Sequence, residues 1–241
     1  MVNRLRAKHP GSPLARLLFY ELGRWLTLLL LIACYRHRWF GRRNVPASGA
    51  VLLVANHQAH LDPPIVGCPI FQRHLDFIAR SGLFRSRVFG WMIASLNSTP
   101  IREEGGGDTR AIKDVLARLA AGRAVLIFPE GSRSPDGAIG EFKRGAAVLV
   151  KRAACPVVPV AVEGAFDAWP RTRRLPRLWG RRVMVMYGRP VSPQELLAAG
   201  PDAAVALLRA EIDAMRLELR RKLRRATDGG YPAPGAGDET V

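Results

Sequence analysis

Short apolar runs alternate along most of the chain with longer stretches of helical periodicity. Residues 50–55, which read AVLLVA, have the length and the continuous apolar character of a buried strand. The segments that predict strands are residues 50–55, 74–80, 124–128, 156–164 and 182–188. Because proline cannot donate to a sheet, we expect Pro159 either to break its strand or to confine it to an edge.

Helices are predicted between and after these strands. Residues 108–122 repeat apolar side chains at the i, i+3, i+4 and i+7 spacing of an amphipathic helix. Residues 143–154 predict another helix, and residues 192–225 predict one or two more, which Ser192 and Glu195 would begin as a capping box. Strands that alternate with helices indicate an α/β fold, which we expect as a single layered domain.

The end of the chain differs from this pattern. Residues 226–241 are rich in glycine and proline and predict a disordered tail, which follows a domain over residues 46–225. The basic run just before the tail, residues 220–225 (RRKLRR), predicts a solvated helix face.

The N-terminal region, residues 1–45, contains the most apolar run of the chain. That run, residues 25–35, has 11 residues and no charge, so as a helix it would cross roughly half of a ~30 Å hydrocarbon core. Extending it towards the N-terminus reaches spanning length but includes Arg16, Glu21 and Arg24. Glu21 and Arg24 are three residues apart and could pair on one helical face. We therefore expect a helix that lies in the membrane interface or dips into one leaflet, rather than a clean span.

Basic and aromatic residues flank the apolar run. RLRAK precedes it and RHRWFGRR follows it, and both would meet anionic headgroups if the helix lay on a membrane. Arginine-rich sequence, not a small-residue cleavage site, comes after the run, which argues against a signal peptide. A helix buried in the protein core is the alternative. We expect residues 1–45 to associate with a membrane surface.

The composition narrows the choice of partners. The chain has 37 Lys and Arg against 20 Asp and Glu, a formal net charge of +17, which suggests nucleic acid, an anionic membrane or a phosphorylated substrate. Residues 171–182 alone hold six arginines and no acidic residue; a solvated face is the simpler interpretation of such a run. Cys34, Cys68 and Cys155 form no C-x-x-C pair, which argues against a disulfide framework or zinc site and fits a reducing compartment.

The first candidate for chemistry lies in NHQAHLD, directly after the apolar run of residues 50–55. His57 and Asp62 form an H-x4-D pair, and α/β proteins place ligands at the carboxyl ends of strands. The carboxylate could fix the imidazole tautomer and stabilise the imidazolium, while the other ring nitrogen takes a proton from a hydroxyl. A metal site of His57, His60 and Asp62, or an ordinary polar turn, are the alternatives.

A second candidate cluster is FPEGSRS, residues 128–134, which also follows an apolar run. Gly131 permits a positive φ or a close backbone approach. Arg133 offers a planar fork for phosphate, and Ser132 adds a hydroxyl donor. Glu130 could orient Arg133 or hold a substrate hydroxyl. A surface turn with an ion pair is the alternative here.

Together these segments resemble the PlsC-type glycerolipid acyltransferase family, whose type member is 1-acylglycerol-3-phosphate acyltransferase. Its N-H-x-S-x-x-D pattern resembles NHQAHLD, with Ala59 at the serine position, and its F-P-E-G-[TS]-R-S pattern matches FPEGSRS in full. The FKRG segment resembles the family's F-K-K-G, and CPVVPV resembles its V-P-[IV]-x-P-V strand, with Cys155 at the first valine. A looser block has Arg80 at a basic position, Gly82 where glutamate is usual, and Arg102 at a later arginine.

The resemblance implies a single layered α/β acyltransferase domain with an N-terminal membrane-associating helical segment, located at the cytoplasmic face of a membrane. It implies His57 as general base and Asp62 as its orienting partner. The acceptor, a lysophospholipid, would attack the carbonyl of acyl-CoA or acyl-carrier protein, without a cofactor, a metal or a covalent acyl-enzyme. The residues implied for substrate binding are Arg80, Arg102, Glu130, Gly131, Ser132, Arg133 and Lys143.

Two other functions stay open at this point. The same chemistry could act on another acceptor, such as glycerol-3-phosphate or a different lysolipid. A non-catalytic basic protein that binds membranes or nucleic acid would need only the arginine runs, but it leaves the full FPEGSRS match unexplained. We therefore expect anionic lipid, and no nucleic acid, as a partner.

Overall fold

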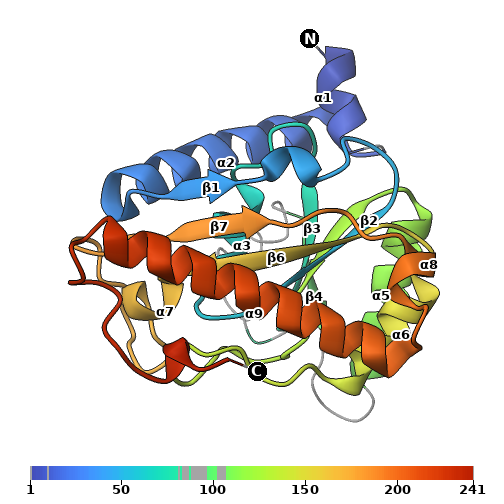
Figure 1. The fold of residues 1–241 in the computed structure, drawn as a ribbon. Coiled ribbons are helices and arrows are strands. Elements are labelled where there is room, and N and C mark those ends of the chain that lie inside the picture. The colour runs from blue at the N-terminus through green and yellow to red at the C-terminus, as the bar shows by residue number, and fades with distance from the viewer. Residues whose placement is uncertain are drawn as a thin grey trace.

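The computed structural model describes residues 2–9, 11–80, 82, 87, 97–101 and 107–240. These residues form a seven-stranded sheet in the order β1-β7-β6-β2-β5-β3-β4 (Figure 1). The strands are β1 (Arg38–Phe40), β2 (Val51–Ala55), β3 (Leu75–Arg80), β4 (Ser98–Ile101), β5 (Ala124–Ile127), β6 (Val157–Glu163) and β7 (Met184–Tyr187). All neighbours are parallel except β6 and β7, so the α/β fold class predicted from the sequence is confirmed.

The strands predicted from apolar runs are present, and the two additional strands, β1 and β4, lie at the edges of this sheet. Strand β6 differs from the expectation, because it runs unbroken between β7 and β2 with every residue buried. The carbonyl of Pro159 accepts a hydrogen bond of 2.8 Å from the backbone N–H of Gly188, just beyond the end of β7. The missing proline N–H therefore falls where the pairing with β7 ends, and it costs the sheet little.

Two layers of helices cover the sheet, and alternate residues of β2 show which face each layer buries. Val51, Leu53 and Ala55 pack in one core with side chains of α2 and α3. Leu52 and Val54 pack in the other core with α5, α6 and α9. The helices are α1 (Val2–Lys8), α2 (Leu14–Tyr35), α3 (Asp62–Gly67), α5 (Gly107–Ala120), α6 (Arg144–Arg152), α7 (Ala165–Ala168), α8 (Pro193–Leu196) and α9 (Pro201–Arg225), with 3-10 turns η1 (Arg42–Asn44) and η3 (Ala236–Asp238).

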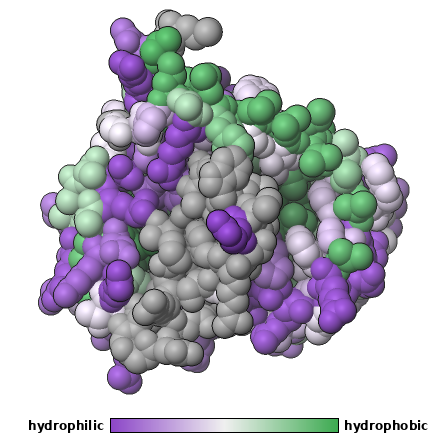
Figure 2. All heavy atoms as spheres, turned by 180° about the vertical axis from the view of Figure 1, so that it is seen from behind, coloured by the Kyte–Doolittle hydropathy of each residue, from purple (hydrophilic) through white to green (hydrophobic). Residues whose placement is uncertain are grey.

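Helix α2 has one buried side and one exposed side. Glu21 and Arg24 pair, as predicted, and they do so on the buried side, where Glu21 also accepts a hydrogen bond of 2.9 Å from His74. Arg16, near the start of the helix, is exposed, but from Leu18 onward the outward side is apolar. Its large exposed side chains are Leu18, Leu22, Trp25, Leu26, Leu29, Leu30 and Ile32. Figure 2 shows hydrophobic side chains gathered in a band over this helix. By length and composition alone α2 could cross a membrane, but its charged pair lies against the domain rather than outward.

The C-terminal part of the chain is more tightly packed than the sequence predicts. Residues 192–225 form two helices, and the Ser192 hydroxyl accepts from the Glu195 backbone N–H at 3.1 Å, as expected for a cap. Instead of a disordered tail, the structure places residues 226–240 along α9, which crosses the front of Figure 1. The guanidinium of Arg220 binds the Asp238 carboxylate at 2.8 Å and the carbonyl of Ala233 at 2.7 Å.

Candidate active site

The two motif loops lie side by side at one edge of the sheet. Strands β2 and β5 are parallel neighbours with Val54 opposite Ile127, so the residues that follow them emerge together. The backbone N–H of Ser134 donates to the carbonyl of His57 at 2.7 Å, which joins the two loops directly. The fold thus assembles one site from segments about seventy residues apart, at the strand ends where α/β sheets bind ligands.

His57 is held by a buried carboxylate. Its Nδ1 lies 2.7 Å from Oδ2 of Asp62, which is the first residue of α3 and is fully buried. The same oxygen accepts hydrogen bonds from the backbone N–H groups of Gln58 (2.5 Å) and Ala59 (2.7 Å). Because Oδ2 already accepts from two backbone N–H groups, it acts as an acceptor toward His57 as well, so Nδ1 carries the proton and Nε2 is the basic ring nitrogen. This is the arrangement that the H-x4-D spacing predicts.

The His57 ring and backbone are fixed independently of Asp62. The imidazole stacks on Phe128, with centroids 4.2 Å apart. The backbone N–H of His57 donates to Oε1 of Glu130 at 2.7 Å, and the Gly140 N–H donates to Oε2 at 3.1 Å. Burial raises the pKa of Glu130 to about 7, although both hydrogen bonds oppose the shift. Glu130 therefore braces the loop that carries His57, a role that its position beside an arginine motif did not indicate.

The loop after β5 presents its polar groups differently. Gly131 has a φ of +67°, as its sequence position suggests, and a Cβ there would lie 2.5 Å from Cε of Lys143. The Lys143 side chain thus crosses directly over the Gly131 backbone. Ser132 is exposed and Arg133 is half-buried, whereas the Ser134 hydroxyl is buried and accepts from the Gly137 N–H at 2.9 Å. Gly131, Ser132, Arg133 and Lys143 consequently lie in one surface region beside His57.

The structure describes only part of the two other arginines of the predicted site. The backbone of Arg80 ends β3, the neighbour of β5, at the same edge of the sheet, but its side chain is outside the described part of the chain. Arg102 lies outside the described residues altogether. Both remain predictions from the sequence pattern.

A buried polar network behind His57 was not anticipated from the sequence. The Gln58 amide nitrogen donates to the Glu163 carboxylate at 2.9 Å, and Arg220 binds the other carboxylate oxygen at 2.6 Å. Burial raises the pKa of Glu163, while the neighbouring arginines oppose that shift. The expectation that residues 220–225 form a solvated face is wrong for Arg220, which is buried. A carboxylate at the end of the apolar run of β6 was the one sequence signal for this network.

Asn56 extends strand β2 by means of its side chain. Its amide nitrogen donates to the Val162 carbonyl at 2.9 Å, and its amide oxygen accepts from the Val162 N–H at 2.7 Å. This pairing fixes the point at which the chain leaves the sheet, one residue before His57.

The metal alternative finds no support in the described part of the chain. No group of three His, Cys, Asp or Glu side chains there could hold a metal ion. The His60 ring instead packs edge-on against Trp169, with centroids 5.2 Å apart. An imidazole with an ionised orienting partner and a basic surface beside it suits proton abstraction from a hydroxyl on an anionic substrate.

A family model described as Acyltransferase matches residues 36–163, which contain both motif loops. The chain belongs to the acyltransferase family. At the serine position of the family's first motif, this chain has Ala59, which is fully buried and supplies its backbone N–H to Asp62. The His57–Asp62 pair is therefore complete without that serine.

Curated relatives of this chain come from plants, bacteria and animals. A chloroplast 1-acyl-sn-glycerol-3-phosphate acyltransferase of Brassica napus is 33% identical over 54% of this chain and 38% of its own length. The enzyme of that name from Pseudomonas aeruginosa is 32% identical over 61% of this chain and 56% of its own. The alpha form from Mus musculus is 29% identical over 88% of this chain and 73% of its own. The chain thus spans about two fifths of the length of the Brassica relative.

A solved structure has the same fold. The crystal structure of the 1-acyl-sn-glycerophosphate acyltransferase PlsC from Thermotoga maritima matches with a TM-score of 0.68 and 24% sequence identity. The match covers 86% of this chain and 81% of the Thermotoga chain.

Proposed function

We propose that this acyltransferase moves a fatty acyl group from an acyl thioester to the free hydroxyl of 1-acylglycerol-3-phosphate, which yields phosphatidic acid. The observation that carries the proposal is the 2.7 Å contact between Nδ1 of His57 and the buried Asp62 carboxylate. The names of several relatives, 1-acyl-sn-glycerol-3-phosphate acyltransferase, support this acceptor.

The geometry suits a single displacement. Nε2 of His57 takes the proton from the acceptor hydroxyl as its oxygen attacks the thioester carbonyl carbon, and Asp62 stabilises the resulting imidazolium. The tetrahedral intermediate then collapses, the carbon–sulfur bond breaks, and the imidazolium returns the proton to the leaving thiolate. The products are an ester and a free thiol. Holding both substrates beside one base supplies the rate gain without a cofactor or a covalent acyl-enzyme.

The basic surface beside His57 suits the acceptor phosphate. Arg133 and Lys143 are its described members, and the Lys143 side chain lies against the Gly131 backbone. A guanidinium can grip two phosphate oxygens at once, and an ammonium adds a point charge. Arg80 and Arg102 are further candidates from the sequence pattern.

The exposed side of α2 supports a location on a membrane surface. Its seven exposed apolar side chains face away from the domain, while Arg24 and Glu21 are held against it. Such a helix buries its apolar face at the headgroup boundary. Both acceptor and product are lipids, so this placement brings the site to them. The three free cysteines support the cytoplasmic face.

The decisive experiment is acyl transfer from radiolabelled acyl-CoA to lysophosphatidic acid in vesicles, with His57→Ala compared with wild type. The matched control is His60→Ala, an exposed histidine three residues away that faces Trp169. We expect labelled phosphatidic acid from wild type and His60→Ala, and a loss of about 10³-fold or more in folded His57→Ala. Equal activity in His57→Ala and wild type would overturn the mechanism.

The same assay resolves donor and acceptor. Acyl-carrier protein in place of acyl-CoA tests the donor, since the net charge of +17 suits either anionic carrier. A panel of glycerol-3-phosphate and other lysolipids tests the acceptor. A clear preference for an acceptor other than lysophosphatidic acid would keep the His57 mechanism and overturn the assignment of the product.

A further inference from the structure

The loop between α7 and β7 exposes large apolar side chains to a degree unusual for this chain. Leu175 is 74% exposed, Trp179 is 70% exposed and Leu178 is 49% exposed. On the outer side of α2 the most exposed apolar side chain, Leu29, reaches 64%. Leu175 and Trp179 are thus more exposed than any apolar side chain on the helix proposed to lie on the membrane.

This loop is held in place at its base. The backbone N–H of Arg177 donates to the Ala168 carbonyl at 2.8 Å, and its guanidinium donates to the Asp167 carbonyl at 2.9 Å. The indole N–H of Trp169 donates to the Arg173 carbonyl at 3.1 Å. The backbone of the loop is therefore held by hydrogen bonds, and this backbone keeps the side chains of Leu175, Leu178 and Trp179 exposed.

Positive charge surrounds the apolar tips. Residues 171–182 contain six arginines and no acidic residue. Among the described residues, no carboxylate pairs with the exposed Arg171, Arg173 or Arg174. Segments that combine leucine and tryptophan with arginine bind at the headgroup region of anionic bilayers. The apolar side chains leave water there, and the guanidinium groups bind lipid phosphate.

The loop also lies next to the end of α2. Val183, the residue that follows it, donates its N–H to the Tyr35 carbonyl at 3.1 Å and accepts from the Arg38 N–H at 3.2 Å. Tyr35 is the last residue of α2, and the next residue, Arg36, is exposed. The arginine-rich loop therefore joins strand β7 next to the C-terminal end of α2, where the exposed apolar side of that helix ends.

We propose that residues 171–182 form a second membrane-contact loop, which inserts Leu175, Leu178 and Trp179 into an anionic bilayer while its arginines bind lipid phosphate. With α2 it gives the domain a second attachment, beside the C-terminal end of that helix, and two attachments fix the orientation of the site on the lipid surface. The inference rests on the proposed function in so far as both require α2 to lie on the membrane.

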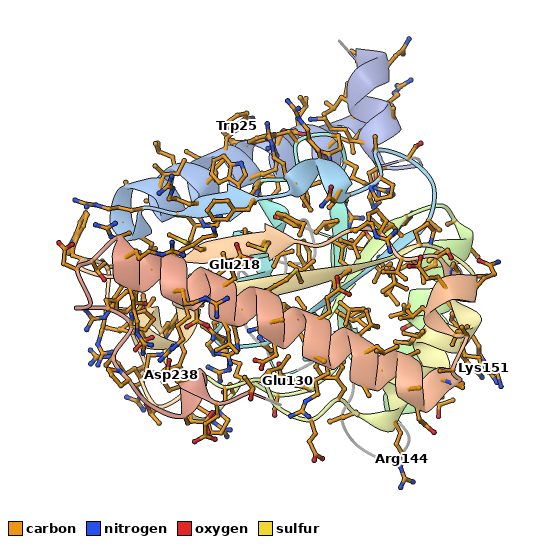
Figure 3. The ribbon with its side chains drawn as sticks, in the orientation of Figure 1. Trp25, Glu130, Arg144, Lys151, Glu218 and Asp238 are labelled. Carbon is orange, nitrogen blue, oxygen red and sulfur yellow. The ribbon has the colours of Figure 1, made fainter. Side chains whose placement is uncertain are left out.

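A fluorophore sensitive to solvent polarity tests insertion directly. It is attached to Leu175→Cys in the full chain with Cys34→Ser, because Cys68 and Cys155 are buried. The matched control carries the same fluorophore at Lys151→Cys, an exposed site on α6. Lys151 lies at the right edge of Figure 3, whereas α7, which precedes the loop, lies at the left in Figure 1. The vesicles contain phosphatidylcholine alone or phosphatidylcholine with phosphatidylglycerol.

We expect the emission at position 175 to shift to the blue and to rise several-fold with phosphatidylglycerol vesicles, while emission at position 151 stays that of a probe in water. Identical responses at the two positions would overturn the proposal. A shift at position 175 with acidic acyl-carrier protein but not with vesicles would also overturn it, and would assign the loop to a protein partner.

A second measurement uses the triple variant Leu175→Ser, Leu178→Ser, Trp179→Ser. We expect its apparent Kd for phosphatidylglycerol vesicles to rise about tenfold or more, with acyl transfer to detergent-dispersed acceptor unchanged. An unchanged Kd would contradict the proposal. Failure of the proposed function would appear instead as wild-type protein without acyl transfer on any acceptor, a result that leaves the fluorescence comparison intact.

Discussion

The two loops that form the site are built in opposite ways. In the loop after β2, Asn56, Gln58 and Asp62 are buried, and each is bound to backbone or to another buried side chain. In the loop after β5, the groups proposed to bind substrate, among them Ser132 and Lys143, face solvent. The protein interior thus holds the proposed base, His57, in one place, whereas the groups proposed to bind an anion are left accessible to a substrate that arrives from outside.

This difference matches the two proposed functions of the site, proton abstraction by His57 and binding of the acceptor phosphate. A base must keep one tautomer and one orientation, which buried hydrogen bonds supply before the substrate arrives. Groups that bind a phosphate must give up water when the ligand enters, so they lie at the surface. Substitutions in the first loop should therefore reduce kcat or stability, and substitutions in the second should raise KM.

The largest effect is expected from Asp62→Asn. The amide carries no negative charge and accepts more weakly from the three groups around Oδ2, so the His57 ring is held less firmly in its tautomer and the imidazolium loses the charge that stabilises it. We expect kcat to fall by about 10³- to 10⁴-fold, with little change in KM. Steady-state kinetics of the folded variant check this, with Asp202→Asn on the exposed start of α9 as control. A loss smaller than tenfold would contradict it.

The next effect concerns the buried network behind the first loop. Arg220→Met removes the nearer of the two arginines that pair with the fully buried Glu163 carboxylate, and leaves only Arg216, whose nearest nitrogen is 3.6 Å away. Breaking a buried pair on one side costs about 3–5 kcal/mol of the free energy of unfolding. Urea unfolding measures it, and Arg221→Met, an exposed neighbour, should change stability by no more than about 0.5 kcal/mol. Similar losses in both variants would argue against the network.

Much of the fold follows from sequence patterns, and the exceptions have physical causes. Five strands are marked by apolar runs, but β1 (RWF) and β4 (STPI) are short and have no continuous apolar run. They lie at the edges of the described sheet, where only one neighbour is needed. The prediction for Pro159 was wrong because a proline is excluded from a central strand only where the neighbour that its N–H would face still needs that hydrogen bond. Pro159 pairs with Gly188, one residue beyond the end of β7.

In the site, too, contacts between residues close in sequence were predictable, and contacts between distant residues were not. His57 and Asp62 are five residues apart, so their contact is local and the spacing predicts it. Gln58 and Glu163 are 105 residues apart, and Glu163 and Arg220 are 57 apart, so only the fold reveals that they meet. Glu130 precedes Arg133 in sequence and suggested an ion pair, but both of its oxygens bind backbone N–H groups of other segments.

A smaller effect is expected in the pH dependence of stability, through Glu130. Burial raises its pKa from 4.5 to about 7, so the folded state holds a proton that the unfolded state has released. Its contribution is fully present below pH 4.5 and is lost as the pH rises through about 7, a change of about 3 kcal/mol. Wild type should therefore lose stability relative to Glu130→Gln over this interval. Urea unfolding at several pH values measures the difference, and a constant difference would contradict the raised pKa.

The smallest effect is expected in the exposed loop, where Arg133→Gln removes a proposed phosphate ligand without touching the base. Loss of a charge-assisted contact should raise KM for lysophosphatidic acid by about 10- to 100-fold and leave kcat within a few-fold. Arg144→Gln is the matched control, because Figure 3 shows this exposed arginine of α6 pointing away from the domain. With monoacylglycerol, which has the hydroxyl but no phosphate, wild type and Arg133→Gln should be equally slow. A fall in kcat at unchanged KM would instead place Arg133 with the rigid half of the site, and the contrast between the two loops would not hold.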